Sequence, residues 1–183
     1  LGDVYKRQGQ NKESCLSPRK RKSAYESALT MLGARDHASS ELKSKLLGKG
    51  YAEEEVTQVL DRLRGLGYLD DPRYARQTVR FLLERERLGV LRARQRLLEK
   101  GLPRDLVEEV LTQAVGETDE QEIAFSAAKR KLALLREPDA KKQREKLWRH
   151  LASRGFTGEV ILAVLRRLEK IKGSEEEDES FEQ

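Results

Sequence analysis

The chain has 183 residues and a formal net charge of +5, and 37% of its residues are hydrophobic, 38% charged and 5% aromatic. So much charge with so few aromatic side chains favours slender helices with wide solvated faces over a thick sandwich core. No apolar run reaches the roughly 20 residues that span a bilayer, so no membrane helix is expected. Cys15 is the one cysteine, which excludes an internal disulfide and leaves no zinc-ligand set. We therefore expect a cytoplasmic protein that holds neither a metal nor an organic cofactor.

Both ends of the chain have the composition of disordered segments. Residues 1–22 are basic, contain Gly, Ser and Pro, and show no helical apolar period, so this segment is predicted to be disordered. Its stretch Val4–Gln8 resembles translated sequencing-adapter text, and we expect part of the segment to be non-native. Residues 173–183 include the acidic run Glu175–Glu179, which predicts a second disordered tail.

Three glycines between these ends mark an internal repeat. Gly50, Gly101 and Gly155 each follow a basic residue and precede a large apolar one, at intervals of 51 and 54 residues. A glycine in this position ends a helix in the left-handed conformation, and the residue after it folds back onto the last turn in a Schellman motif. The pairs predicted to pack in this way are Tyr51 on Leu46, Leu102 on Leu97 and Phe156 on Leu151.

An amphipathic helix is predicted after each glycine, and a further helix precedes each glycine-terminated one. The apolar positions of the later helices step i, i+3, i+4, i+7, which is typical of one buried helical face. These positions are Val56, Val59, Leu60 and Leu63; Val107, Val110, Leu111 and Ala114; and Ile161, Val164, Leu165 and Leu168. Pro103 is predicted at a first helical position, Thr157 at an N-cap, and Asp71-Pro72 at the cap of the second repeat.

The sequence therefore predicts an all-α fold of three tandem three-helix repeats, at residues 23–70, 71–116 and 117–172. Modules of roughly 50 residues bury little surface alone, so we expect them to lean on one another in an elongated, curved array. A monomer is expected. A less specific explanation is that many helix hairpins end in glycine and an apolar residue, but three copies at regular spacing favour the repeat.

A row of basic residues recurs on the helices that end at these glycines. Spacing of four places Arg92, Arg96 and Lys100 on one helix face. The candidate binding residues are Lys45, Lys49, Arg76, Arg80, Arg92, Arg96, Lys100, Lys146 and Arg154. Two interpretations stay open. The row is either a solvated face that keeps the protein in solution, or a surface for acidic protein groups or DNA phosphates with nonspecific, salt-sensitive contacts.

The segment Gly67-Tyr68-Leu69-Asp70-Asp71, followed by Tyr74-Ala75, is similar to the most recognisable segment of the RecX family. Further matches in the first and third repeats are Ala24, Ala28, Leu29, Leu32, Arg35, Ser39, Glu41, Leu42 and Lys45, and Leu147, Leu151, Arg154, Gly155, Phe156, Ile161, Val164 and Leu165. The resemblance implies a cytoplasmic protein of tandem three-helix modules that binds RecA. It further implies that the protein lodges in the groove of the RecA–DNA filament and modulates recombinase, ATPase and coprotease activity in DNA repair.

Catalysis is not expected. The two histidines, His37 and His150, lie far apart in sequence and are predicted at the surface. The sequence has no Walker loop, dinucleotide fingerprint or metal-ligand cluster. The expected partners are RecA and its DNA filament, with weak nonspecific DNA contact. Two alternatives stay open: a helical protein that binds DNA directly without sequence specificity, and a generic helical-repeat scaffold for protein interactions.

Overall fold

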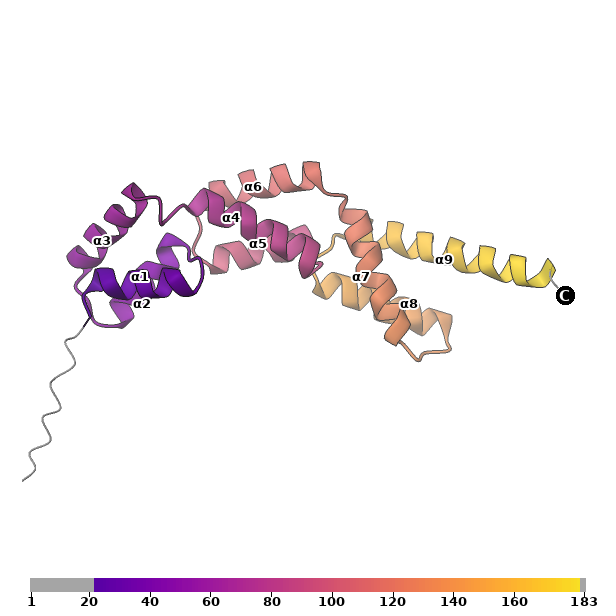
Figure 1. The fold of residues 1–183 in the computed structure, drawn as a ribbon. Helices are drawn as coiled ribbons and strands as arrows, with labels where there is room; N and C mark the ends of the chain where they lie inside the picture. Colours follow the sequence, from indigo (N-terminus) through magenta and orange to yellow (C-terminus); the bar gives the residue numbers. More distant parts are fainter. Residues whose placement is uncertain (1–21, 182–183) are drawn as a thin grey trace, which may run out of the picture.

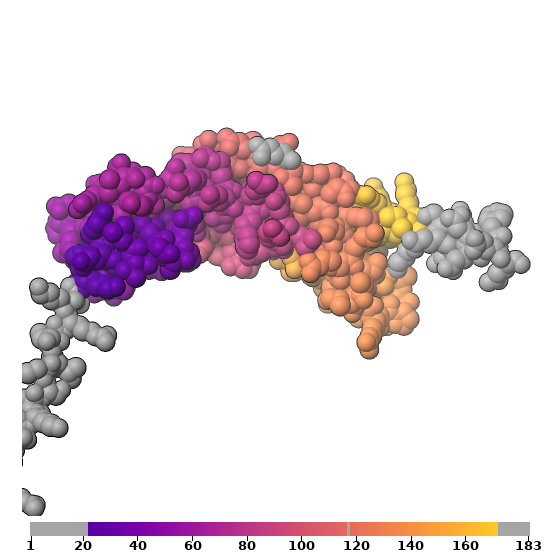
Figure 2. Space-filling model, viewed as in Figure 1, coloured from indigo at the N-terminus to yellow at the C-terminus, as the bar shows by residue number. Residues whose placement is uncertain are grey.

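The computed structural model describes residues 22–181, without the side chains of residues 117 and 172–181. Within this part of the chain the structure has nine α-helices, one π-helical turn and no strand. The helices form three groups that follow one another along an arch (Figure 1), and the space-filling view shows the hollow under that arch between the first and third groups (Figure 2). The predicted all-α, elongated and curved repeat fold is confirmed. The predicted disordered segment, residues 1–22, lies outside the described residues except for Lys22.

The first repeat consists of α1 (Ala24–Ala34), α2 (Ser39–Gly48) and α3 (Glu53–Gly65). Ser23 starts α1 with a capping box, in which its hydroxyl accepts a hydrogen bond from the Glu26 N–H while the Glu26 carboxylate accepts one from the Ser23 N–H. The core of this repeat consists of Ala24, Ala28, Leu42, Leu46, Val56, Val59, Leu60, Leu63 and Leu69. It contains all four apolar residues that the sequence predicted for α3.

The second repeat consists of α4 (Asp71–Arg80), a π-helical turn η1 (Phe81–Arg85), α5 (Val90–Glu99) and α6 (Arg104–Glu117). Its buried core contains Ala38, Ala75, Val79, Leu82, Leu83, Leu88, Ala93, Leu97, Leu102, Val107, Val110 and Leu111. One of these residues, Ala38, belongs to the first repeat. The cores of the first two repeats therefore adjoin.

The third repeat consists of α7 (Glu120–Leu134), α8 (Ala140–Ser153) and α9 (Gly158–Phe181). The prediction of a disordered acidic tail from residue 173 is wrong as far as Phe181, because α9 continues through this stretch. Glutamate has a good intrinsic helix propensity, and no proline interrupts the run. High charge indicates exposure to solvent, but it does not by itself prevent helix formation.

The glycine turns that define the repeat have the predicted geometry. The φ angles are 83° at Gly50, 74° at Gly101 and 84° at Gly155. At the end of α5, the Leu102 N–H donates to the Leu97 carbonyl at 3.3 Å and the Gly101 N–H donates to the Leu98 carbonyl at 2.8 Å. These are the two hydrogen bonds of a Schellman motif, and both recur at the ends of α2 and α8.

Two of the predicted helix starts need correction. Asp70, not Asp71, caps α4, because the Asp70 carboxylate accepts from the Arg73 N–H at 2.8 Å. Asp71 instead accepts from the Ser39 N–H at 2.8 Å, so it caps α2 of the preceding repeat. Pro103 lies at the N-cap, one residue before the first residue of α6. Sequence spacing did not reveal that a carboxylate of one repeat caps a helix of another.

The second helices of the three repeats, α2, α5 and α8, are joined end to end through the glycine turns. At the start of α5, the Gly89 N–H donates to the Arg154 carbonyl at the end of α8, at 2.9 Å. At the start of α2, the Ser40 hydroxyl donates to the Lys100 carbonyl at the end of α5, also at 2.9 Å. Carbonyl groups that lack a partner at the end of one helix thus accept hydrogen bonds from donors at the start of another helix. The negative end of one helix dipole faces the positive end of the other, which favours this arrangement.

Candidate partner-binding cleft

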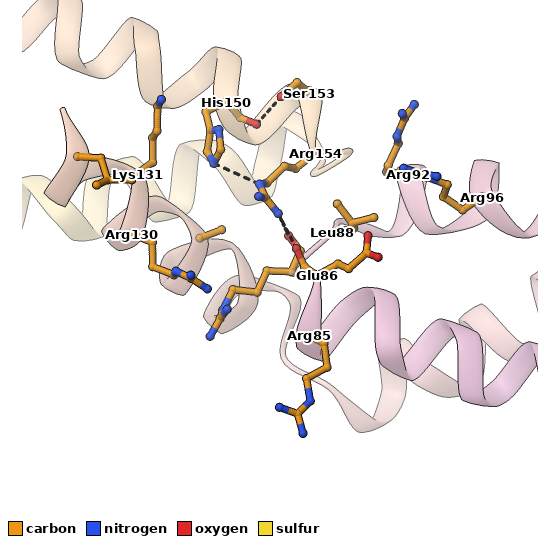
Figure 3. A pocket seen from close by; sticks show the side chains of 13 residues that line it. Arg85, Glu86, Leu88, Arg92, Arg96, Arg130, Lys131, His150, Ser153 and Arg154 are labelled. Carbon is orange, nitrogen blue, oxygen red and sulfur yellow. Dashed lines mark hydrogen bonds between the residues drawn. The ribbon is translucent and has the colours of Figure 1, made fainter. Parts of the chain in front are cut away.

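The second and third repeats enclose a basic cleft of about 750 Å³. Of the nine predicted binding residues, Arg92, Arg96 and Arg154 line it. Four further basic residues of the cleft were not among the predicted ones: Arg85, Arg87, Arg130 and Lys131. Arg92 and Arg96 approach from α5 on one side and Arg130 and Lys131 from α7 on the other, with Arg154 between them (Figure 3).

The charges of the cleft are uncompensated. None of its seven basic side chains forms an ion pair with any carboxylate whose side chain the structure describes. Glu86 is the one carboxylate that lines the cleft, and it also forms no ion pair within that part of the chain. Some exposed cations elsewhere on the array are paired, as Arg80 is with Glu84 and Arg64 with Asp61. A concentration of unpaired positive charge in a cleft raises the local concentration of anions.

Arg154 holds the inner wall of the cleft together. Its guanidinium donates to the Glu86 carbonyl at 2.5 Å, and its Nε–H donates to Nε2 of His150 at 3.2 Å (Figure 3). His150 is half-buried, and desolvation together with the positive charges of Arg154 and Lys131 lowers its pKa. A neutral imidazole can accept this bond. His150 is therefore partly buried, whereas the sequence predicted a position at the surface.

Lys45 and Lys100 lie at the other junction, between the first and second repeats. Both pair with the Glu41 carboxylate, with N–O distances of 3.1 Å from Lys45 and 3.8 Å from Lys100. Arg35 pairs with the same carboxylate. His37, which was predicted at the surface, is only 5% exposed, and its ring contacts the Lys45 amine at 3.0 Å. At this junction three cations therefore share one carboxylate.

The remaining predicted residues do not join the cleft. Arg76 and Arg80 line a separate groove of about 450 Å³ beside α6. Lys146 pairs with Glu137 at 2.6 Å. Lys49 makes a contact of its own and does not line the cleft. The predicted row of equivalent residues is therefore divided among several places by the turn from one repeat to the next.

The described residues contain no group of three or more His, Cys, Asp or Glu side chains that could hold a metal ion. Within residues 22–181 no helix combines the length and the hydrophobicity that crossing a bilayer requires. What the geometry offers is a cleft that can bind anions, with no arrangement of nucleophile and base around it.

The fold and the cleft define a class of protein: a tandem array of three-helix repeats with an anion-attracting cleft between two of them. Family models for RecX match all three repeats, the first three-helix domain at residues 24–63, the second at 70–111 and the third at 117–165. The chain belongs to the RecX family of regulatory proteins.

Individual relatives cover most of the chain. The regulatory protein RecX of Chlorobaculum tepidum is 38% identical over 148 residues, which are 80% of this chain and 89% of the relative. That of Deinococcus radiodurans is 36% identical over 152 residues, which are 83% of this chain and 71% of the relative. The crystal structure of RecX from Lactobacillus salivarius has a TM-score of 0.69 at 21% identity, and the match covers 80% of this chain and 94% of that one. This last likeness shows the shared fold.

Proposed function

We propose that this chain regulates the RecA recombinase by binding the RecA–DNA filament, with the cleft between the second and third repeats facing the filament. The membership in a family of regulatory proteins supports a role without catalysis. The observation that carries the choice of surface is the set of seven basic side chains without ion pairs. A nucleoprotein filament presents both acidic side chains and phosphates to such a surface.

The mechanism that fits an elongated array is to bridge neighbouring parts of the filament. A curved chain of repeats presents several contacts along its length, so it binds an ordered polymer more tightly than a free subunit. Bound in this way, a monomer restrains filament growth and thereby modulates recombinase, ATPase and coprotease activity. The proposed site of action is the cytoplasm.

The test is inhibition of the DNA-dependent ATPase of RecA. We expect strong inhibition when RecA greatly outnumbers the chain, because one bound copy restrains many subunits of a filament. Inhibition that requires equimolar protein, or no inhibition at all, would contradict the proposal.

A second candidate is direct competition for DNA, and the arginine content of the cleft favours it, because guanidinium groups bind phosphate oxygens in pairs. The same assay with DNA in excess separates the two. Inhibition that disappears with added DNA supports competition, whereas inhibition that persists supports binding to the filament.

A further inference from the structure

The two junctions between repeats are built from equivalent positions, yet their charged side chains are paired differently. Counted back from the glycine turns, the position of Glu41 in the first repeat corresponds to Arg92 in the second. The positions of the two lysines that pair with Glu41 correspond to Arg96 and Arg154. Arg35, the third cation that pairs with Glu41, corresponds to Glu86, so the equivalent positions of each junction hold three cations and one carboxylate. At the first junction the carboxylate pairs with all three cations, whereas at the second junction these groups form no ion pair with one another.

The shared carboxylate matters for the first junction because it accepts from cations of both repeats. Arg35 and Lys45 belong to the first repeat, and Lys100 belongs to the second. The Glu41 side chain is only 17% exposed, so solvent screens these pairs less than it would on an open surface. At the second junction, like charges face one another across the cleft, and their repulsion works against closure.

The second junction is also held by little apolar packing. All of the extensive helix–helix contacts within residues 22–181 lie inside single repeats. The cores of the second and third repeats are separate clusters, and the partly buried Ile123 packs against both. Among the ties that cross the junction are backbone bonds at Gly89, the Arg154 guanidinium and a bond from the Arg87 guanidinium to the Ser126 hydroxyl at 2.9 Å. Such a junction is sensitive to the charge placed in its cleft.

We propose that the cleft binds a short stretch of single-stranded nucleic-acid backbone. Its phosphates bind the cations of the second junction as the Glu41 carboxylate binds those of the first. This binding locks the angle between the second and third repeats. This extends the proposed function, because the strand is the one carried by the filament. Six of the seven basic side chains are arginines, whose planar forks each bind two phosphate oxygens. A cleft of about 750 Å³ has room for a short stretch of one strand but not for the whole cross-section of a double helix.

The first experiment measures binding of a short fluorescent oligothymidylate to the full chain without RecA. Each phosphate contact to a single strand contributes about −0.7 to the slope of log K against log salt. Replacing three cleft cations together, Arg92→Gln, Arg96→Gln and Arg130→Gln, is therefore expected to reduce the slope by about 2. The matched control replaces three exposed arginines outside the cleft, Arg73→Gln, Arg104→Gln and Arg166→Gln, and is expected to keep the wild-type slope.

Two results of that experiment would overturn the phosphate site. One is an equal loss of binding in the cleft variant and in the control variant, which would indicate only general attraction by net charge. The other is equally tight binding of an acidic peptide of the same charge, which would assign the cleft to protein carboxylates. Far-ultraviolet circular dichroism checks that each variant keeps its helical content.

The second experiment measures the angle at the junction. Spin labels on cysteines introduced at Thr112 in α6 and Lys141 in α8, in a Cys15→Ser background, report the distance between the two repeats. We expect oligothymidylate to narrow the distance distribution of the wild-type chain. Arg92→Glu restores a carboxylate at the place equivalent to Glu41, so it should narrow the distribution without any strand and abolish strand binding. Arg92→Gln should bind weakly and stay broad.

Two results would overturn the locking of the junction. One is a distance distribution that oligothymidylate leaves unchanged. The other is a distribution for Arg92→Glu that is as broad as the one for Arg92→Gln. Both experiments omit RecA. A negative result therefore removes the strand site while the ATPase assay still decides the proposed function.

Discussion

Replacing the shared carboxylate at the first junction, Glu41→Gln, is expected to destabilise the array measurably. Desolvation by itself raises the pKa of this carboxyl, but the bonds from Arg35 and Lys45 outweigh it and lower the pKa from 4.5 to about 2. At about 1.4 kcal/mol per unit, the shift sets a ceiling of about 3 kcal/mol. The side chains of Arg35 and Lys45 are 47% and 42% exposed, so solvent screens them, and we expect a loss of about 1–2 kcal/mol.

The pH dependence of this loss follows from the direction of the pKa shift. The pKa of Glu41 is lower in the folded state than in the unfolded state. The contribution of its ion pairs to the free energy of unfolding is therefore complete above pH 4.5 and disappears as the pH falls through about 2. Urea unfolding followed by circular dichroism, at neutral pH and at several acidic values, measures it. The difference in unfolding free energy between the wild-type chain and Glu41→Gln should shrink steadily over that interval.

The control is Glu84→Gln, which removes an exposed pair with Arg80 one helical turn away. Such pairs contribute about 0.3–0.5 kcal/mol, so this variant should lose little. The reasoning is refuted if Glu41→Gln costs no more than Glu84→Gln at neutral pH, or if its cost is the same at every pH.

Further predictions concern a glycine turn, a helical glycine, the core and the second groove. Gly155→Ala forces a left-handed φ of 84° on alanine and brings its Cβ against the backbone of α5, so urea unfolding should show a loss of more than about 1 kcal/mol. Gly48→Ala, in a helical position with open space, should instead gain up to about 1 kcal/mol in the same assay. Leu97→Ala removes a fully buried side chain and should cost about 2–5 kcal/mol, measured by denaturant unfolding. Arg76→Gln combined with Arg80→Gln leaves the cleft intact, so the inhibition of the RecA ATPase should stay at the wild-type level, and a marked loss would move the partner surface to the second groove.

The fold could be predicted from the sequence because its signals are local. Each Schellman turn depends on a glycine and two apolar residues within six positions, such as Leu97, Gly101 and Leu102. The buried face of α3 follows directly from the helical period of residues 56–63. Repetition of both signals three times then fixed the number of modules.

The cleft could be predicted only in part, because it depends on how one repeat is rotated against the next. Arg92 and Arg96 share a helix face, so their proximity was visible in the sequence. Arg87 and Arg130 come from a loop and from the first helix of the next repeat, and no spacing relates them. Likewise, the Glu41 carboxylate that pairs with three cations at the first junction was not recognised as different from other helical acids.

The most direct measurement of the central claim is retention of the chain on RecA filaments assembled on single-stranded DNA. It compares the wild-type chain, the variant with Arg92→Gln, Arg96→Gln and Arg130→Gln, and the control with Arg73→Gln, Arg104→Gln and Arg166→Gln. We predict that the wild-type chain and the control stay bound to the filaments while the cleft variant is washed away. A cleft variant retained as well as the wild-type chain would contradict the account, because the uncompensated cations of the cleft would then have no part in binding.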